Sequence, residues 1–121
     1  MPPISKDPVR RVPFAIASGQ TTSDKQDLMG HVIVGIITPS TLTSTAITFE
    51  QFVPNADYPE AAGTWVPVHD SDGTEVSITV AADRFTAVNP TAVPYAGMTR
   101  IVAGSAEGAD RVIHLVTRAL G

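Results

Sequence analysis

The residues best suited to chemistry are three histidines and an acidic turn, and their spacing builds no recognisable metal site. His31, His69 and His114 lie 38 and 45 residues apart, whereas a metal site carried on one strand needs short spacings such as i, i+2. The turn Asp70-Ser71-Asp72-Gly73 resembles the start of a calcium loop, but position 12 of that loop would be Ala81 and not glutamate. We therefore expect a turn here and no bound metal.

Catalytic groups are equally scattered. The segment Gly104-Ser105-Ala106-Glu107-Gly108 has no strand-to-helix setting for a nucleophilic serine and reads as a loop. The carboxylates of Asp57, Glu60, Asp70 and Asp83 could meet only in the folded chain, and nothing in the sequence places two of them together. The sequence thus predicts no catalytic residue, no cofactor and no enzyme, while a small enzyme whose site forms only on folding stays open as an alternative.

Three aromatic residues raise the alternative of a carbohydrate-binding module, because such modules present flat rings to sugars. Tyr58, Trp65 and Tyr95 are isolated and share no period, which is more typical of rings in cores and interfaces. Stacking on nucleic acid would need interleaved basic residues, and the net charge of −4 opposes it. The longest apolar run, 32–37, is far shorter than the roughly 20 residues of a membrane span. We expect neither nucleic acid nor membrane as a partner.

The composition favours strands and turns over helices. The chain has 14 Thr and 14 Val against two Lys, together with 10 Pro and nine Gly. No cysteine is present, so disulfides are excluded. Charged residues make up 17%, below the roughly 25% of typical domains. We therefore expect part of the surface to be covered by another molecule.

Alternation of apolar and polar residues, interrupted by turns, predicts about eight strands. It places Ile47 and Phe49 inward in one strand, and Phe85 and Ala87 inward in another. The spacing predicts an all-β fold, an antiparallel two-sheet β-sandwich with jelly-roll connections, over residues 14–121.

The segment 111–120 is apolar on both faces. As a strand it places Ile113 and Leu115 in the core and Val112, His114 and Val116 on the opposite face, although a helix stays open. That second face needs a cover, which predicts a subunit interface formed by Val112, His114 and Val116.

Residues 1–13 differ from the rest because they hold four prolines and carry a charge of +2, from Lys6, Arg10 and Arg11 against Asp7. Proline donates no backbone hydrogen bond, so we expect an extended arm and not a strand within a sheet. The arm would attach to a partner through the residues Ile4, Val9, Arg10, Arg11 and Val12. A frayed tail is the alternative.

The order of several motifs resembles small structural proteins of tailed-bacteriophage virions. These motifs are Ala17-Ser-Gly-Gln-Thr-Thr-Ser-Asp24, the apolar strand 31–39, Ala46-Ile-Thr-Phe-Glu50, Asp70-Ser-Asp-Gly-Thr-Glu-Val76, Tyr95-Ala-Gly-Met-Thr-Arg-Ile101 and Ala109-Asp-Arg-Val-Ile-His-Leu-Val-Thr-Arg118. The chain departs from that pattern in the long loop 52–63 and at Met98-Thr99-Arg100-Ile101.

The resemblance implies a non-enzymatic decoration or cement protein, of the head-fibre kind. It would bind the major capsid protein on the outer surface of a phage head, and its position at a symmetry axis would suit a homotrimer. The alternatives are an adaptor at the tail or fibre, and the carbohydrate-binding module.

Overall fold

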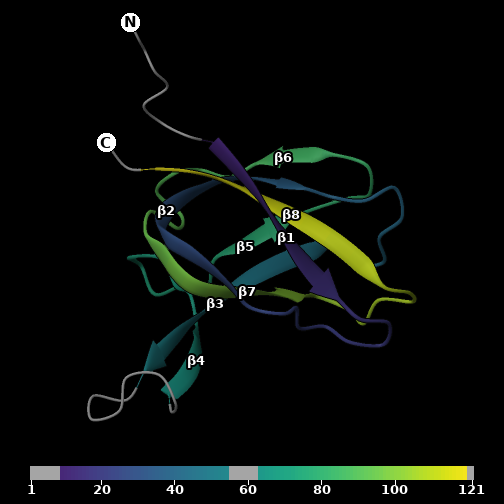
Figure 1. Ribbon diagram of the computed structural model, residues 1–121, viewed down its shortest axis with the longest axis horizontal. Helices are drawn as coiled ribbons and strands as arrows, with labels where there is room; N and C mark the ends of the chain where they lie inside the picture. Colours follow the sequence, from purple (N-terminus) through teal and green to yellow (C-terminus); the bar gives the residue numbers. More distant parts are fainter. Residues whose placement is uncertain (1–8, 55–62, 120–121) are drawn as a thin grey trace, which may run out of the picture.

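The computed structural model describes residues 9–54 and 63–119, and eight strands run through these ranges (Figure 1). Their hydrogen-bonded order is β1-β8-β2-β7-β3-β4, with β5 beside β3 and β6 beside β2, and every pairing is antiparallel. The strands are β1 (Val9–Ile16), β2 (Gln26–Ile37), β3 (Ala46–Pro54), β4 (Gly63–Pro67), β5 (Ser77–Thr79), β6 (Phe85–Ala87), β7 (Ala96–Ala103) and β8 (Arg111–Arg118).

This arrangement confirms the predicted all-β fold. The strands form one large antiparallel sheet that does not close. Two separate sheets and jelly-roll connections, which the strand count had suggested, are not shown by this pairing.

A bend in β2 gives the sheet its shape. The first part of β2 pairs with β7 and the last part pairs with β8 and β6. Within the part paired with β7, at the register shift between Asp27 and His31, Met29 and Gly30 take left-handed backbone angles, with φ of 57° and 77°. Glycine adopts this conformation without a steric penalty, and the Met29 amide donates to Asp27 Oδ1 at 2.8 Å, which holds the bend. The two halves of the sheet can therefore face one shared core.

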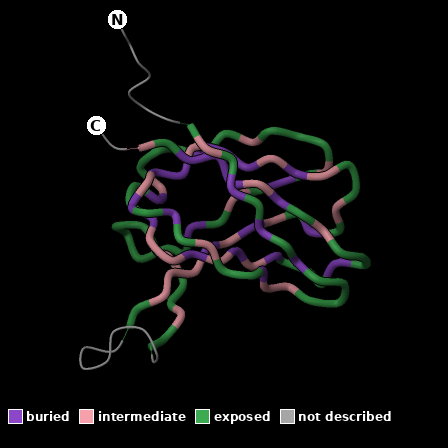
Figure 2. Tube along the Cα trace, in the orientation of Figure 1, coloured by how far each residue is buried: buried purple, intermediate pink, exposed green. Residues whose placement is uncertain are grey.

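The core is built from the inward side of both halves (Figure 2). Ile47 and Phe49 of β3, and Ile113 and Leu115 of β8, are completely buried, as the alternation predicted. Residues 111–118 form a strand and not the alternative helix. The core also takes Phe14, Ile16, Leu28, Ile33, Ile36 and Ile101, all without exposed surface.

The predicted boundary of the N-terminal arm is wrong for residues 9–13. This segment belongs to β1, which pairs with β8 from Val9 opposite Arg118 to Ile16 opposite Arg111. Because β1 is an edge strand, it is hydrogen-bonded on one side only, and Pro13 is tolerated there. Residues 1–8, including Ile4, lie outside the described residues.

The predicted acidic turn is confirmed, and the residues on either side of it pair, with an antiparallel bridge between His69 and Glu75 and a hydrogen bond from the Val76 amide to the Val68 carbonyl at 2.9 Å. Asp70 Oδ1 accepts hydrogen bonds from the amides of Asp72 and Thr74 at 2.9 and 3.0 Å, and Gly73 has a φ of 85°. The strands on either side, β4 and β5, both pair with β3, one after the other along its length.

Candidate interaction surface

Four strands, β1, β8, β2 and β6, place a set of mostly apolar side chains on the side of the sheet away from the core. Residues directly opposite one another in antiparallel strands point to the same side, so the register groups them. We call this set the outer face, and it comprises Val9, Arg11, Pro13, Ala15, Val32, Gly35, Ile37, Phe85, Ala87, Val112, His114, Val116 and Arg118.

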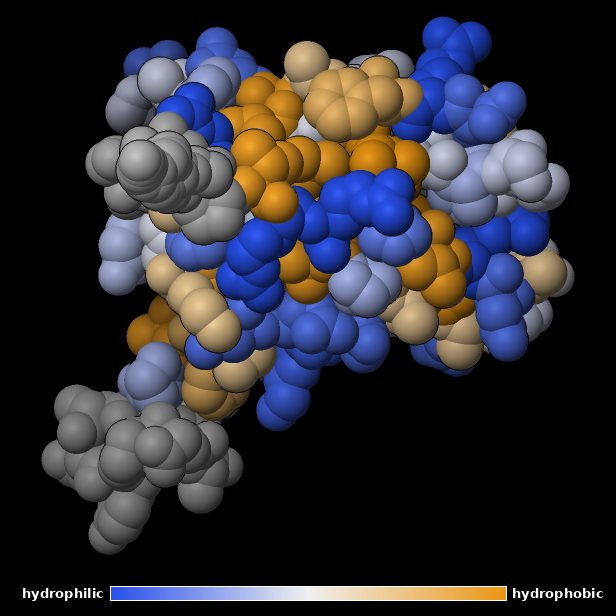
Figure 3. All heavy atoms as spheres, turned by 45° about the horizontal axis from the view of Figure 1, so that its top comes forward, coloured by the Kyte–Doolittle hydropathy of each residue, from blue (hydrophilic) through white to orange (hydrophobic). Residues whose placement is uncertain are grey.

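Large apolar side chains on the outer face reach the surface. Phe85 is 59% exposed and Val112 is 45% exposed, while Val116 is only 7% exposed. Figure 3 brings the β6 side of the molecule forward and shows hydrophobic atoms gathered there, crossed by hydrophilic ones. Contiguous exposed apolar surface is typical of a site that binds another protein.

Phe85 reverses its predicted orientation. The alternation placed Phe85 and Ala87 in the core, but both are exposed, and the Phe85 ring lies over Gly35. A Cβ added at Gly35 would lie 2.5 Å from Phe85 Cζ. Because β6 has only three residues, its alternation of apolar and polar residues is too short to show which of them point into the core. A glycine inside an apolar strand marks a close approach by another group. Gly35 was therefore the feature of the sequence that indicated this contact.

Two sets of residues predicted as separate sites form parts of one surface. Val112, His114 and Val116 share the non-core side of β8, as predicted, with His114 between Pro13 and Ile37 in the register. Two residues of the predicted arm, Val9 and Arg11, lie beside them on β1.

Val12 and Arg10, the other two residues of the predicted arm that lie on β1, do not belong to the outer face. Val12 is 6% exposed and belongs to the core, so its predicted role as an attachment anchor is wrong. Arg10 is half-buried, and its Nη1 donates to Met29 Sδ at 3.8 Å. Val12 packs in the core of its own chain, because the inward side of β1 lies next to Leu115 of β8.

Positive charge lies along the edge of the outer face. Arg11 is exposed on the edge strand and Arg118 is exposed at the end of β8, whereas Arg84 lies before β6 and its backbone bonds to Thr38. The ion pairs in the described part of the chain are Arg100 with Glu50 and Arg111 with Glu107. Arg11 and Arg84 therefore form no ion pair with any described residue.

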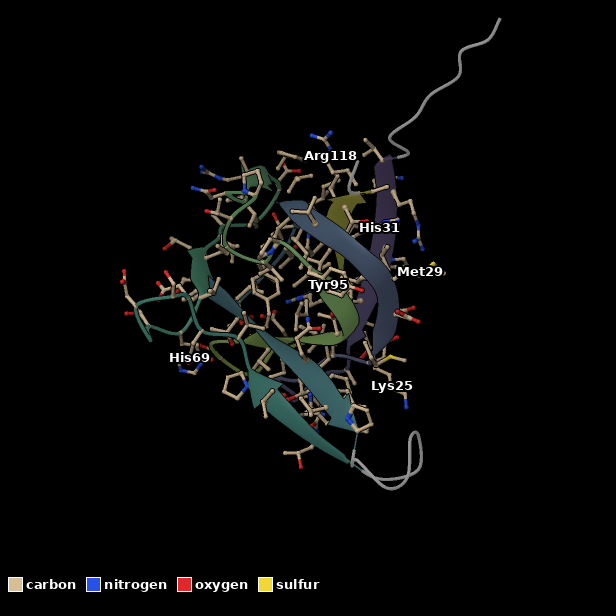
Figure 4. The ribbon with its side chains drawn as sticks, turned by 90° about the vertical axis from the view of Figure 1, so that its left-hand side faces the viewer. Lys25, Met29, His31, His69, Tyr95 and Arg118 are labelled. Carbon is tan, nitrogen blue, oxygen red and sulfur yellow. The ribbon has the colours of Figure 1, made fainter. Side chains whose placement is uncertain are left out.

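An open hollow of about 690 Å³ carries the opposite charge. Asp70, Asp72 and Glu75 line it, all of them exposed and in no ion pair with the described residues. Figure 4 shows His69, which also lines the hollow, on the opposite side of the molecule from β1. The hollow and the outer face are thus two distinct surfaces.

The three histidines stay apart in the fold. His31 lies on β2 and its Nδ1 is buried without a hydrogen-bond partner, His69 Nδ1 lies 3.1 Å from the Pro67 carbonyl oxygen, and His114 lies on β8. Within 9–54 and 63–119, no group of three or more His, Asp or Glu side chains is placed to hold a metal ion.

Glu107, in the predicted loop 104–108, is a buried carboxylate. It is 1% exposed. Its Oε1 accepts from the Thr43 amide at 2.9 Å and from Arg111 Nε at 3.0 Å, and its Oε2 accepts from the Ser44 amide and Ser44 Oγ at 2.9 and 2.6 Å. Its backbone bonds to Gly19 and Gln20. One residue thereby joins the loops that follow β1, β2 and β7.

The same contacts keep Glu107 charged. Burial by itself raises the pKa of a carboxyl. Here the hydrogen bonds from Ser44, Thr43 and Arg111 outweigh burial and lower the pKa of Glu107 from 4.5 to about 2. The donors Thr43 and Ser44 lie 64 and 63 residues away in sequence, so no local pattern could have revealed them.

The predicted sugar-binding rings do not gather into one platform. Arg100 lies 4.4 Å from the centroid of the Trp65 ring, and Phe52 packs against Trp65 with the ring centroids 5.4 Å apart. Tyr95 is 71% exposed and lies beside Gly30 on the bend of β2. Tyr58 lies outside the described residues.

No protein-family model, no curated protein and no solved structure matches this chain. A search of the described residues for a helix long and apolar enough to cross a membrane finds none. The resemblance to phage virion proteins therefore stays a prediction.

Proposed function

We propose that this chain is a non-enzymatic structural protein of a bacteriophage particle. It binds the outer surface of the head as a decoration or cement protein, with the major capsid protein as its partner and a homotrimer as its working form. The observation that carries this proposal is the outer face, which leaves Phe85 and Val112 exposed on a four-stranded surface.

Covering that surface stabilises an assembly. Burying a Phe or Val side chain that is otherwise in water contributes about 1.5 to 3 kcal/mol. Val112, His114 and Val116 then lie at the contact between subunits. Arg10 and the preceding segment with Ile4 serve attachment to the capsid, while Val9 and Arg11 lie on the outer face at its β1 edge. We further propose that the sheet, bent at β2, belongs to the two-sheet sandwiches with jelly-roll connections.

Co-sedimentation with purified heads of the phage that encodes the chain tests this function. The full-length protein should pellet with heads and stay in the supernatant without them. Deleting residues 2–8 should weaken pelleting while leaving β1 and the unfolding transition unchanged. The deletion must stop before Val9, because Val12 is part of the core. Failure of the full-length protein to bind heads would overturn the proposal, and binding to tails instead would favour the adaptor.

The carbohydrate-binding alternative is favoured by a single observation, the 71% exposure of Tyr95. Trp65 favours it less, because Arg100 already lies over its ring. Titration of the protein with a panel of glycans, followed by the NMR signals of both rings, separates the two functions. A saturable shift of either ring together with no binding to heads would replace the decoration role.

A further inference from the structure

Charge is separated by sign between the two surfaces described above. Arg11 and Arg118 lie on the outer face. Three carboxylates line the hollow, those of Asp70, Asp72 and Glu75. Opposite potentials of this kind favour docking of one surface on the other and disfavour docking of either surface on itself.

The hollow also offers apolar surface to match the outer face. Its lining includes Val76, Ile78, Ala92 and Pro94. Val76 is 8% exposed, Ile78 and Ala92 are half-buried, and Pro94 is exposed. Each surface therefore combines apolar side chains with charges of one sign, and the signs differ.

A threefold ring requires two different patches, because each of its contacts joins one part of a subunit to another part of the next. We propose that the outer face of one copy binds the hollow around Asp70, Asp72 and Glu75 of the next copy. This inference rests on the proposed homotrimer and names the surfaces that form it. The occupant of the apolar outer face is thus a second copy of this chain.

Arginine is suited to the edge of such a contact. Its guanidinium forms paired hydrogen bonds with a carboxylate, and these are stronger where the neighbouring apolar contact excludes water. Two outer faces placed against each other would instead bring Arg11 opposite surface charge of its own sign. The charge pattern therefore selects the head-to-tail contact over a twofold one.

Charge reversal tests the contact by sedimentation velocity over a range of protein concentrations. Arg11→Glu and Asp72→Arg should each raise the dissociation constant for self-association by about tenfold or more. The double variant R11E/D72R should return it to within a few-fold of the original value. Lys25→Glu is the matched control, because Lys25 is an exposed cation in the loop before β2, outside both surfaces.

A mismatched pair removes net charge as an explanation. The variant K25E/D72R has the same net charge as the unaltered chain, yet it should associate as weakly as D72R alone. An equal mixture of R11E and D72R should regain association, because each variant complements the other. The two must alternate around a ring, so the mixture should form even-numbered assemblies and no trimer.

The outcomes separate this contact from the proposed function. Trimers that are unaffected by R11E and D72R would overturn the contact and leave the trimer in place. Open-ended assemblies rescued by the double variant would support the contact and overturn the trimer. An unaltered chain that stays monomeric at every concentration would overturn the contact, whereas binding to phage heads is decided by the separate co-sedimentation experiment.

Discussion

A buried charge such as Glu107 and an exposed apolar surface such as the outer face are both unfavourable in a folded chain. In this structure Glu107 has partners within the chain, whereas the outer face stays exposed. A buried carboxylate without partners is strongly destabilising, and Glu107 receives hydrogen bonds from Thr43, Ser44 and Arg111. The exposed rings and methyl groups of the outer face receive no such cover, with Phe85 at 59% exposure.

This difference indicates that Glu107 stabilises the fold and that the outer face serves association. The contacts of Glu107 are complete within one chain, so this residue serves the fold by fixing three loops. The outer face is incomplete within the described chain, so it serves association. Substitutions at Glu107 should therefore change stability, and substitutions on the outer face should change assembly.

Glu107→Gln should produce the largest loss of stability. The neutral amide loses the charged pair with Arg111 and places an N–H donor among groups that are themselves donors, at a cost of about 3 kcal/mol. Urea unfolding followed by circular dichroism measures the change. Asp110→Asn is the control on the same loop, because its carboxylate is exposed and accepts one hydrogen bond from the Ser18 amide. A loss of less than about 1 kcal/mol for E107Q would contradict a structural role.

Lowering the pH should remove the contribution of the charged Glu107 carboxylate to the free energy of unfolding. The pKa of Glu107 falls from 4.5 to about 2 on folding, so the unfolded chain binds a proton more readily. The resulting stabilisation, about 3 kcal/mol, is fully present above pH 4.5 and is lost as the pH falls toward 2.

The readout for this acid effect is the difference in unfolding free energy between the unaltered chain and E107Q, because other carboxylates titrate in both. The difference should shrink steadily from pH 5 to pH 2. A difference that does not depend on pH would show that the charge of Glu107 is not what holds the loops.

Gly35→Ala should reduce stability by a smaller amount, through the contact between Gly35 and Phe85 on the outer face. The new Cβ would lie 2.5 Å from Phe85 Cζ, so the ring must move, and overpacking of this kind costs about 1 kcal/mol. Phe85 is 59% exposed, so its ring can shift outward. The double variant G35A/F85A relieves the clash, so a double-mutant cycle should give a coupling energy of similar size. Strict additivity would show that the two residues do not interact.

Val112→Thr should have the smallest effect on the isolated chain. The side chain is 45% exposed and threonine keeps its shape and strand preference, so the free energy of unfolding should change by less than about 0.5 kcal/mol. Self-association should weaken, as measured by analytical ultracentrifugation. Ile113→Thr is the informative neighbour, since its buried side chain should reduce stability. Weakened folding in V112T without weakened association would reverse the assignment of the two sides of β8.

Local pattern was sufficient for much of the fold. Alternation predicted the inward residues of β3 and β8, because a strand exposes its side chains to opposite sides with period two. Turn chemistry predicted the Asp70 to Gly73 turn, whose hydrogen bonds are all local. The apolar second side of 111–120 pointed to Val112, His114 and Val116 before any partner strand was known.

Tertiary structure decided what local pattern could not. The prolines of 1–13 predicted an arm, but pairing with β8 drew residues 9–16 into an edge strand, where one unpaired side accommodates Pro13. The three residues of β6 took their orientation from the space above Gly35. Two of the residues that donate to Glu107, Thr43 and Ser44, lie more than 60 residues away. Sequence reports contacts between near neighbours, whereas the pairing of distant strands decides which side chains share a surface.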